Sequence, residues 1–190
     1  GLTAADLASS VVAVGEDDDL DRALATVRGR LAVAVLDADR RVVGIFTEHD
    51  GVVVALERLA PDLTSSHGGR RPVLTIGSGD PAVEALRRMA AAGCRHLVVV
   101  DDDGRAVGVV SRADLWAEGV HLVARDLVVG ELVARRPLVA SGHPTSLRAA
   151  ASSMVAEKVG CVPLLDRAGR PVAIVTRTDV IEAAFAAVQE

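Results

Sequence analysis

The arrangement of apolar and polar positions along the chain repeats three times, and each copy predicts a strand, a helix, a β-hairpin and a second helix. In the first copy the expected strands span 11–15, 31–37 and 41–47, and the helix between the first two strands spans 20–29. In the second copy the strands span 73–77, 96–101 and 105–111, and the helix spans 83–93. In the third copy the strands span 138–142, 161–166 and 170–176, and the helix spans 147–159. The pattern therefore predicts three copies of one structural unit.

An aspartate precedes a hydroxyl residue by ten positions in every copy. The three pairs are Asp37 and Thr47, Asp101 and Ser111, and Asp166 and Thr176. Turn-forming residues follow each aspartate and Val-rich runs flank them, which is typical of a β-hairpin. The helical stretch before the hairpin is long enough for a crossover that makes the first two strands parallel. Each copy is predicted to be a small mixed three-stranded sheet with helices on one face.

The three copies occupy residues 1–60, 70–122 and 126–190, and a linker rich in Pro, Ser and Gly occupies 61–69. We call them repeats one, two and three. A unit of about 60 residues is marginally stable alone, so the repeats should pack in pairs. Either repeat one pairs with repeat two, or repeat two pairs with repeat three. The remaining repeat would then pair with a second chain about a two-fold axis, so we expect a homodimer.

The third strand of every repeat ends in a hydroxyl residue that is followed three positions later by an aspartate. The pairs are Thr47 with Asp50, Ser111 with Asp114, and Thr176 with Asp179. At a strand-to-helix junction, this spacing is that of a helix capping box. The same position suits a ligand, because a helix N-terminus attracts phosphate and a carboxylate accepts hydrogen bonds from ribose hydroxyls. A structural and a binding interpretation are both compatible with the motif.

Composition excludes several classes of protein. The chain has 190 residues, of which 50% are hydrophobic, enough for a core without a metal or disulfide. Its net charge of -5 argues against binding to nucleic acid or to an anionic membrane. With two Phe, one Trp and no Tyr, it lacks aromatic platforms for stacking bases. It also lacks a signal peptide and a membrane-spanning run, so we expect a cytoplasmic protein.

The sequence contains no pattern that points to catalysis or metal binding. The five histidines are scattered, and neither of the two cysteines has a Cys or His ligand at metal-binding spacing. Glycine-rich phosphate loops of the dinucleotide-binding or nucleoside-triphosphatase type are also absent. We therefore expect neither an enzyme nor a metal site.

The repeated unit resembles the cystathionine β-synthase (CBS) domain. The segments that carry the resemblance are GIFTEHD at 44–50, RHLVVVD at 95–101 and VPLLD at 162–166. The resemblance covers nearly the whole chain and implies an α/β fold of tandem CBS repeats, packed pairwise through their sheets as Bateman modules. It further implies a non-catalytic regulatory module that binds AMP, ADP, ATP or S-adenosylmethionine and requires no cofactor.

The resemblance also suggests which residues would bind the ligand. Contacts to ribose and the adjoining phosphate would come from Ser111, Asp114, Thr176, Asp179, Thr47 and Asp50. Cations near these motifs that could neutralise a phosphate tail are Arg112, Arg177, Arg95, His96, Arg71 and Arg136. The apolar residues that would surround the adenine are Ile76, Val98, Ala140, Pro163, Val14 and Ala34.

Repeat one departs from this cation pattern. It has Glu48 and His49 where the other repeats have an arginine after the hydroxyl residue, which favours ligands at repeats two and three. The competing interpretation is an assembly module that dimerises through the same fold, leaves its clefts empty and uses the hydroxyl–aspartate motifs only as helix caps. The regulated partner is not evident in the sequence.

Overall fold

The computed structural model describes residue 3 and residues 12–59, 73–119 and 127–186. Repeat one contains β1 (Ala13–Gly15), α2 (Leu20–Val27), β2 (Ala32–Leu36), β3 (Val42–Thr47) and α3 (Glu48–Leu56). Repeat two contains β4 (Thr75–Gly77), α5 (Ala82–Ala92), β5 (His96–Val100), β6 (Ala106–Ser111) and α6 (Arg112–Ala117). Repeat three contains α7 (Val129–Val133), β7 (Ser141–Gly142), α8 (Leu147–Glu157), β8 (Cys161–Leu165), β9 (Pro171–Thr176) and α9 (Arg177–Ala186).

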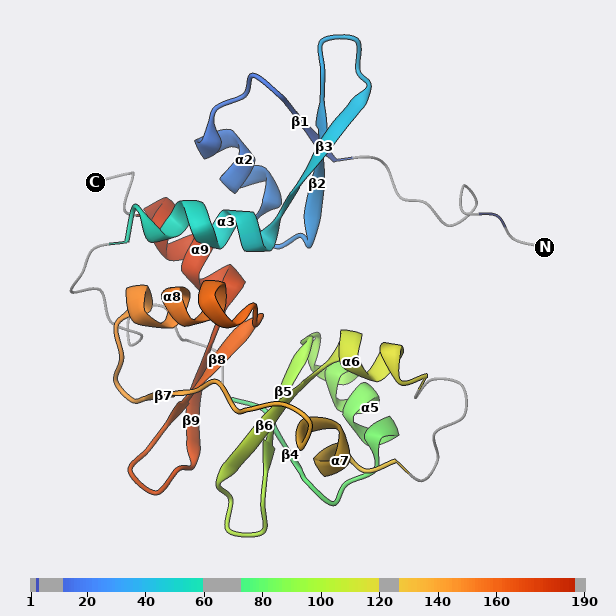
Figure 1. The fold of residues 1–190 in the computed structure, drawn as a ribbon, viewed down its shortest axis with the longest axis vertical. Coiled ribbons are helices and arrows are strands. Elements are labelled where there is room, and N and C mark those ends of the chain that lie inside the picture. Colours follow the sequence, from blue (N-terminus) through green and yellow to red (C-terminus); the bar gives the residue numbers. More distant parts are fainter. Residues whose placement is uncertain (1–2, 4–11, 60–72, 120–126, 187–190) are drawn as a thin grey trace. The chain divides into compact units, whose positions relative to one another are not determined.

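Within these residues the strands form three sheets, ordered β1-β2-β3, β4-β5-β6 and β7-β8-β9 (Figure 1). In each sheet the first two strands are parallel and the last two are antiparallel. The helix between the first two strands provides the crossover that a parallel pair requires. The predicted mixed α/β architecture is confirmed.

The aspartate that begins each hairpin loop holds the loop closed. Asp37, Asp101 and Asp166 each accept a hydrogen bond from the backbone N–H four residues later, at 2.8, 2.9 and 2.9 Å. The residue before that N–H is in the left-handed region, where φ is 63° for Arg40, 77° for Gly104 and 80° for Gly169. The side-chain bond thus stabilises a turn that requires a positive φ, which gives the repeated aspartate a structural role.

The chain divides into two compact units, residues 1–60 with 177–190, and residues 61–176. Repeat three is therefore shared: its sheet and α8 belong to the second unit, whereas α9 belongs to the first. In the first unit α9 packs against α3 and α2. Gly51 allows this approach, because a Cβ there would lie 2.9 Å from Ile181 Cδ1 and 3.3 Å from Val27 Cγ1.

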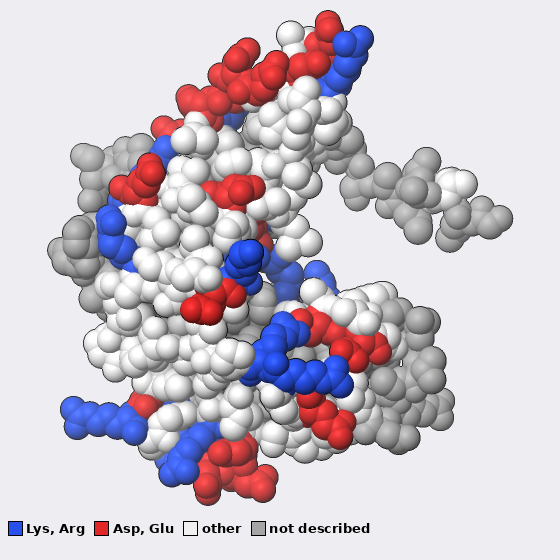
Figure 2. All heavy atoms as spheres, in the orientation of Figure 1, with Lys and Arg blue, Asp and Glu red and all other residues white. Residues whose placement is uncertain are grey.

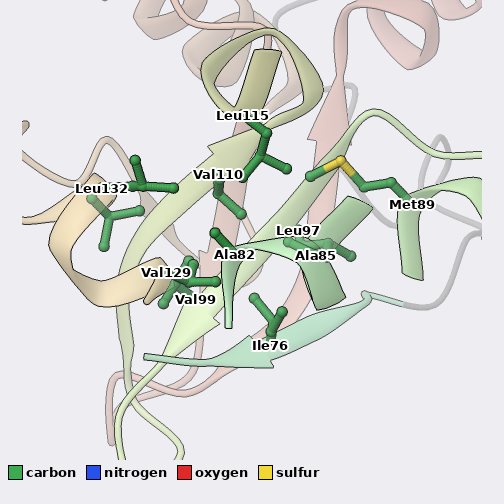
Figure 3. Packing of buried hydrophobic residues seen from close by; sticks show 11 residues of the cluster. Ile76, Ala82, Ala85, Met89, Leu97, Val99, Val110, Leu115, Val129 and Leu132 are labelled. Carbon is green, nitrogen blue, oxygen red and sulfur yellow. The ribbon is translucent and has the colours of Figure 1, made fainter. Parts of the chain in front are cut away.

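The core of repeat two is built from its sheet, its two helices and α7. Figure 3 shows side chains of the sheet facing those of α5 and α6, with α7 packed beside them. Helix α7 begins repeat three in the sequence, yet its residues Val129, Leu132 and Val133 are buried in the core of repeat two. A Cβ on Gly108 would lie 2.4 Å from Val133 Cβ, so α7 reaches the sheet only because this residue is glycine.

Repeats two and three contact each other through their hairpins, which lie side by side in Figure 1. Arg105 Nε donates to the Ala168 carbonyl oxygen at 3.1 Å, and Arg170 Nε donates to the Asp103 carbonyl oxygen at 3.1 Å. The two bonds are reciprocal, as an approximate two-fold relation between the repeats requires. Of the two pairings that the sequence left open, the structure contains the pair of repeats two and three.

The close approach at Gly108 generates a matched pair of substitutions. Gly44 occupies the same ladder position in repeat one, but among the described residues the nearest atom to a Cβ there is Val35 Cβ at 3.8 Å. We expect Gly108→Ala to lower the free energy of unfolding by about 1–3 kcal/mol through overpacking against α7. Gly44→Ala should leave it unchanged or raise it by about 0.4–1 kcal/mol. Urea unfolding followed by circular dichroism measures both, and equal losses would contradict this account of α7.

Candidate functional site

The hydroxyl–aspartate motifs of repeats one and two form complete capping boxes. In repeat two, Ser111 N donates to Asp114 Oδ2 at 2.9 Å and Asp114 N donates to Ser111 Oγ at 3.1 Å. In repeat one, Thr47 N donates to Asp50 Oδ2 at 2.8 Å and Asp50 N donates to Thr47 Oγ1 at 3.2 Å. Each motif therefore fixes the junction between a third strand and the following helix.

The third motif is divided between the two units. Thr176 ends β9 in the second unit, whereas Asp179 lies in α9 of the first unit and is only 8% exposed. Arg177, which we predicted near phosphate, begins α9 and is half-buried. Arg71 lies outside the described residues.

An arginine from the segment between α7 and β7 distinguishes the motif of repeat two. Arg136 Nη2 donates to Asp114 Oδ1 at 2.5 Å, and the neighbouring Arg135 donates to Glu118 Oε1 at 2.9 Å. The two arginines thus bind α6 and its C-cap residue. The Asp114 side chain is 18% exposed and the Arg136 side chain is 65% exposed, so the guanidinium remains accessible to a solute. Among the described residues, no arginine binds Asp50 of repeat one.

Two opposing effects act on the pKa of Asp114. Burial raises it, but the hydrogen bonds and charge of Arg136 together with the hydrogen bonds of Ser111 outweigh burial and hold the pKa below the ordinary 3.8. Asp114 is therefore a carboxylate at neutral pH. As a negatively charged acceptor, it suits hydroxyl donors and cations.

Three further predicted residues lie at the same end of the β5–β6 ladder. His96 begins β5 and pairs with Ser111, and Arg112 N donates to the Arg95 carbonyl oxygen at 2.9 Å. Arg95 and His96 are half-buried, whereas Arg112 is exposed. The structure therefore brings six predicted residues to one end of the sheet: Ser111, Asp114, Arg136, Arg112, Arg95 and His96.

In repeat one the residue that corresponds to Arg112 is Glu48, and its surroundings differ from those of Arg112. Glu48 is 3% exposed and accepts a hydrogen bond from Thr178 Oγ1 at 3.3 Å. This carboxylate thus binds α9 within the first unit instead of facing solvent. Repeat one therefore offers no cation at this position, in agreement with the expectation from its sequence.

The predicted adenine contacts divide by the face of the sheet on which they lie. Ile76 belongs to the hydrophobic core of repeat two (Figure 3), which corrects its expected place beside a purine. In β5, Leu97 and Val99 face that core, so Val98 faces the opposite side and is fully buried there. In repeat three, Pro163 is buried and Ala140 is half-buried. These three residues remain candidate contacts.

The candidate contacts of repeat one do not meet at one place. Val14 is 5% exposed and lines an open hollow of about 370 Å³ together with Leu36, Asp37 and Arg40. This hollow lies at the hairpin end of the sheet, whereas Thr47 pairs with Ala32 at the other end. Ala34 is half-buried between them. Val14 and Thr47 thus lie toward different ends of the sheet, and both remain predicted contacts.

No group of His, Cys, Asp or Glu that could hold a metal ion occurs among the described residues. No helix in the described part of the chain is long and apolar enough to cross a membrane.

Sequence reasoning missed the hydrogen bonds that Arg105 and Arg170 make between the hairpins. Each arginine stands four residues after a hairpin aspartate, and this common spacing is a signal that could have identified them. It also missed Glu118, because only the folded chain places Arg135 next to it.

The lowered pKa of Asp114 predicts a pH dependence of stability. A carboxyl whose pKa is lower in the folded state stabilises the fold above the unfolded pKa, and this contribution is lost as pH falls through the folded pKa. The free energy of unfolding of the wild type should therefore fall below pH 3.8 more steeply than that of Asp114→Asn. Arg136→Gln should make this loss smaller, because without the guanidinium the folded pKa of Asp114 rises toward its unfolded value. Urea unfolding between about pH 3 and pH 6 measures these slopes, and identical slopes in wild type and Asp114→Asn would contradict the assignment.

Comparison with known proteins places this geometry in a family. The family model described as the CBS domain matches residues 4–53, 69–115 and 129–186. Protein MJ1225 of Methanocaldococcus jannaschii is 23% identical over 187 residues, which are 91% of this chain and 66% of that protein. Its crystal structure, proposed as an archaeal homologue of γ-AMPK, has a TM-score of 0.76 at 22% identity and covers 90% of this chain and 66% of that one.

Two smaller structures with bound ligands are also similar. CBSX2, solved in complex with AMP, has a TM-score of 0.56 at 27% identity and covers 67% of this chain and 99% of that one. The CBS domain pair of MJ0100, solved with 5′-methylthioadenosine and S-adenosyl-L-methionine, has a TM-score of 0.56 at 23% identity and covers 64% and 95%. This chain spans between 40% and 66% of the length of the first three curated relatives.

Proposed function

The chain belongs to the CBS domain family, and we propose that its repeats two and three form a regulatory module that binds an adenosine-containing ligand. The ligand class is AMP, ADP, ATP or S-adenosylmethionine. Related CBS-domain proteins support this class, because CBSX2 binds AMP and the MJ0100 pair binds 5′-methylthioadenosine and S-adenosylmethionine. The proposal assigns no catalytic residue and includes the cytoplasmic location that the sequence predicts.

The observation that carries the proposal is the placement of a carboxylate and cations around Ser111. Asp114 is a carboxylate held by Ser111 and Arg136, and it can accept hydrogen bonds from the two hydroxyls of a ribose. Arg136 and Arg112 have exposed side chains that can bind phosphate oxygens, since a guanidinium forms paired hydrogen bonds with phosphate. Both halves of a nucleotide therefore find matching groups at one end of the sheet.

A ligand at this site would act on the connection between the two repeats. Arg136 lies between α7, which belongs to the core of repeat two, and β7, which belongs to the sheet of repeat three. A phosphate that binds Arg136 either displaces the Asp114 carboxylate from the guanidinium, or binds the guanidinium together with that carboxylate. A ligand shifts a conformational equilibrium only by binding one arrangement of the repeats more tightly than another. The bond between Arg136 and Asp114 provides such a difference in affinity.

The alternative function is an assembly scaffold without a nucleotide site. It is favoured by one observation: the motifs of repeats one and two already form complete capping boxes, so Ser111 and Asp114 have a structural role without any ligand. The two functions differ in whether a nucleotide stabilises the protein.

Thermal unfolding against AMP, ADP, ATP, S-adenosylmethionine, NAD and guanine nucleotides separates these functions. A ligand at 100 times its Kd adds about 2.7 kcal/mol, which corresponds to a rise in Tm of roughly 5–10 °C for this length. Asp114→Ala should abolish the rise. Asp50→Ala is the matched control, because it removes the same cap in repeat one and should leave the rise intact. If no nucleotide raises Tm, or if Asp114→Ala retains the rise, the nucleotide site is excluded and the scaffold is favoured.

The adjacent arginines allow the phosphate contact to be tested separately. Arg136→Ala should weaken binding of AMP about 10-fold or more while changing the affinity for adenosine much less, because adenosine lacks the phosphate. Arg135→Ala is the control, since this arginine binds Glu118 and not the motif. Isothermal titration calorimetry with both ligands gives the ratio of affinities. An equal loss for AMP and adenosine would show that Arg136 does not contact phosphate.

A further inference from the structure

The central strand of repeat three contains a proline. Pro163 lies in the middle of β8, which is hydrogen-bonded to β7 on one side and to β9 on the other. Because proline has no N–H, it removes a ladder hydrogen bond and is normally confined to edge strands or bulges. The register shift of this sheet falls between Leu164 and Leu165, so Pro163 is not at the bulge. Exceptions of this kind to a local rule are expected at functional sites.

The other two repeats show which hydrogen bond the proline removes. In repeat one, Ala34 N donates to the Val12 carbonyl oxygen at 3.1 Å. In repeat two, Val98 N donates to the Leu74 carbonyl oxygen at 3.0 Å. Pro163 occupies the ladder position of Ala34 and Val98. The equivalent bond therefore cannot form in repeat three.

The acceptor that loses its donor is the carbonyl oxygen of Val139. This residue stands three positions before Gly142, which ends β7, as Leu74 stands three positions before Gly77, which ends β4. The parallel ladder of repeat three is also one pair shorter than that of repeat two. Val139 is half-buried, and among the described residues no group donates a hydrogen bond to its carbonyl oxygen. Such an acceptor is unfavourable unless water or a ligand supplies a donor.

The side chains beside this carbonyl are apolar. Ser141 pairs with Leu164, and continuing this register by one pair places Ala140 opposite Pro163, which itself pairs with Ile174. Residues that pair across neighbouring strands lie on the same face of a sheet, so these three form an apolar strip. Acidic and basic side chains instead gather at the hairpin tips of repeats two and three (Figure 2). An apolar strip beside one carbonyl acceptor suits a planar base with an amino group better than a phosphate.

We propose that the Val139 carbonyl oxygen accepts a hydrogen bond from the 6-amino group of adenine and selects adenine over other purines. The inference rests on the proposed function and adds its base specificity. Adenine presents an amino donor at position 6, whereas guanine presents an oxygen acceptor there. A site built to receive a donor rejects an analogue that lacks it, because the acceptor of the site then stays unpaired. Pro163 is the positioning residue, since it removes the only competing donor that the ladder would supply.

Pro163→Val tests the inference, because it restores the N–H that Val98 has at this position in repeat two. Isothermal titration calorimetry compares AMP with purine riboside 5′-monophosphate, which lacks the 6-amino group. The wild type should bind AMP at least about tenfold more tightly, and Pro163→Val should lower this ratio to about one. Hydrogen exchange should show the new amide at position 163 to be as protected as that of Val98. Pro171→Ala is the matched control, because it removes the other proline of this hairpin, opposite Leu165, and should leave the ratio unchanged.

The outcomes separate this inference from the proposed function. A wild type that binds the two nucleotides equally, or a ratio that Pro163→Val leaves unchanged, would overturn the inference and retain the nucleotide site. A ratio that Pro171→Ala lowers equally would do the same. Pro163→Ala, which reproduces Ala34 of repeat one, repeats the test, and an unprotected amide at position 163 in both variants would contradict the assignment of the free carbonyl. If neither nucleotide binds the wild type, the proposed function fails and the inference fails with it.

Discussion

A three-stranded sheet has two faces, and in repeat two the helices that build its core cover only one of them. This constraint explains why the repeats associate. In repeat two, Leu97 and Val99 face the helices while Val98 between them is equally buried on the opposite face, so a single repeat cannot supply all of its own cover. The second face is an apolar surface that a unit of about 60 residues cannot leave in water without losing much of its stability. Pairing is therefore part of the fold.

Pairing also explains the position of the candidate site. Helix α7 completes the core of repeat two and then leads through Arg135 and Arg136 to the sheet of repeat three. The chain that connects the paired repeats thus passes over α6, where Arg136 binds Asp114. In repeat one the same capping box exists, but the residue after the hydroxyl is Glu48, which is buried against α9. Equal backbone geometry in the two repeats therefore supports different chemistry.

Local features could be predicted from the sequence, and contacts between distant segments could not. Three strands and a crossover helix per repeat follow from periodicity, and the caps at Ser111 and Thr47 follow from the three-residue spacing. The face on which a strand residue lies depends on which neighbours are buried, so Ile76 was expected at the ligand and lies in the core. The partner of Arg136 is 22 positions away and is brought near only by α7.

The choice between the two pairings was open for the same reason. All three repeats have an arginine four residues after the hairpin aspartate, so the local pattern could not select the two hairpins that meet. In the structure, repeats two and three exchange these arginines, and Arg41 remains in its own loop. The candidate binding site then belongs to the two repeats whose hairpins meet, whereas the helices of repeat one pack against α9.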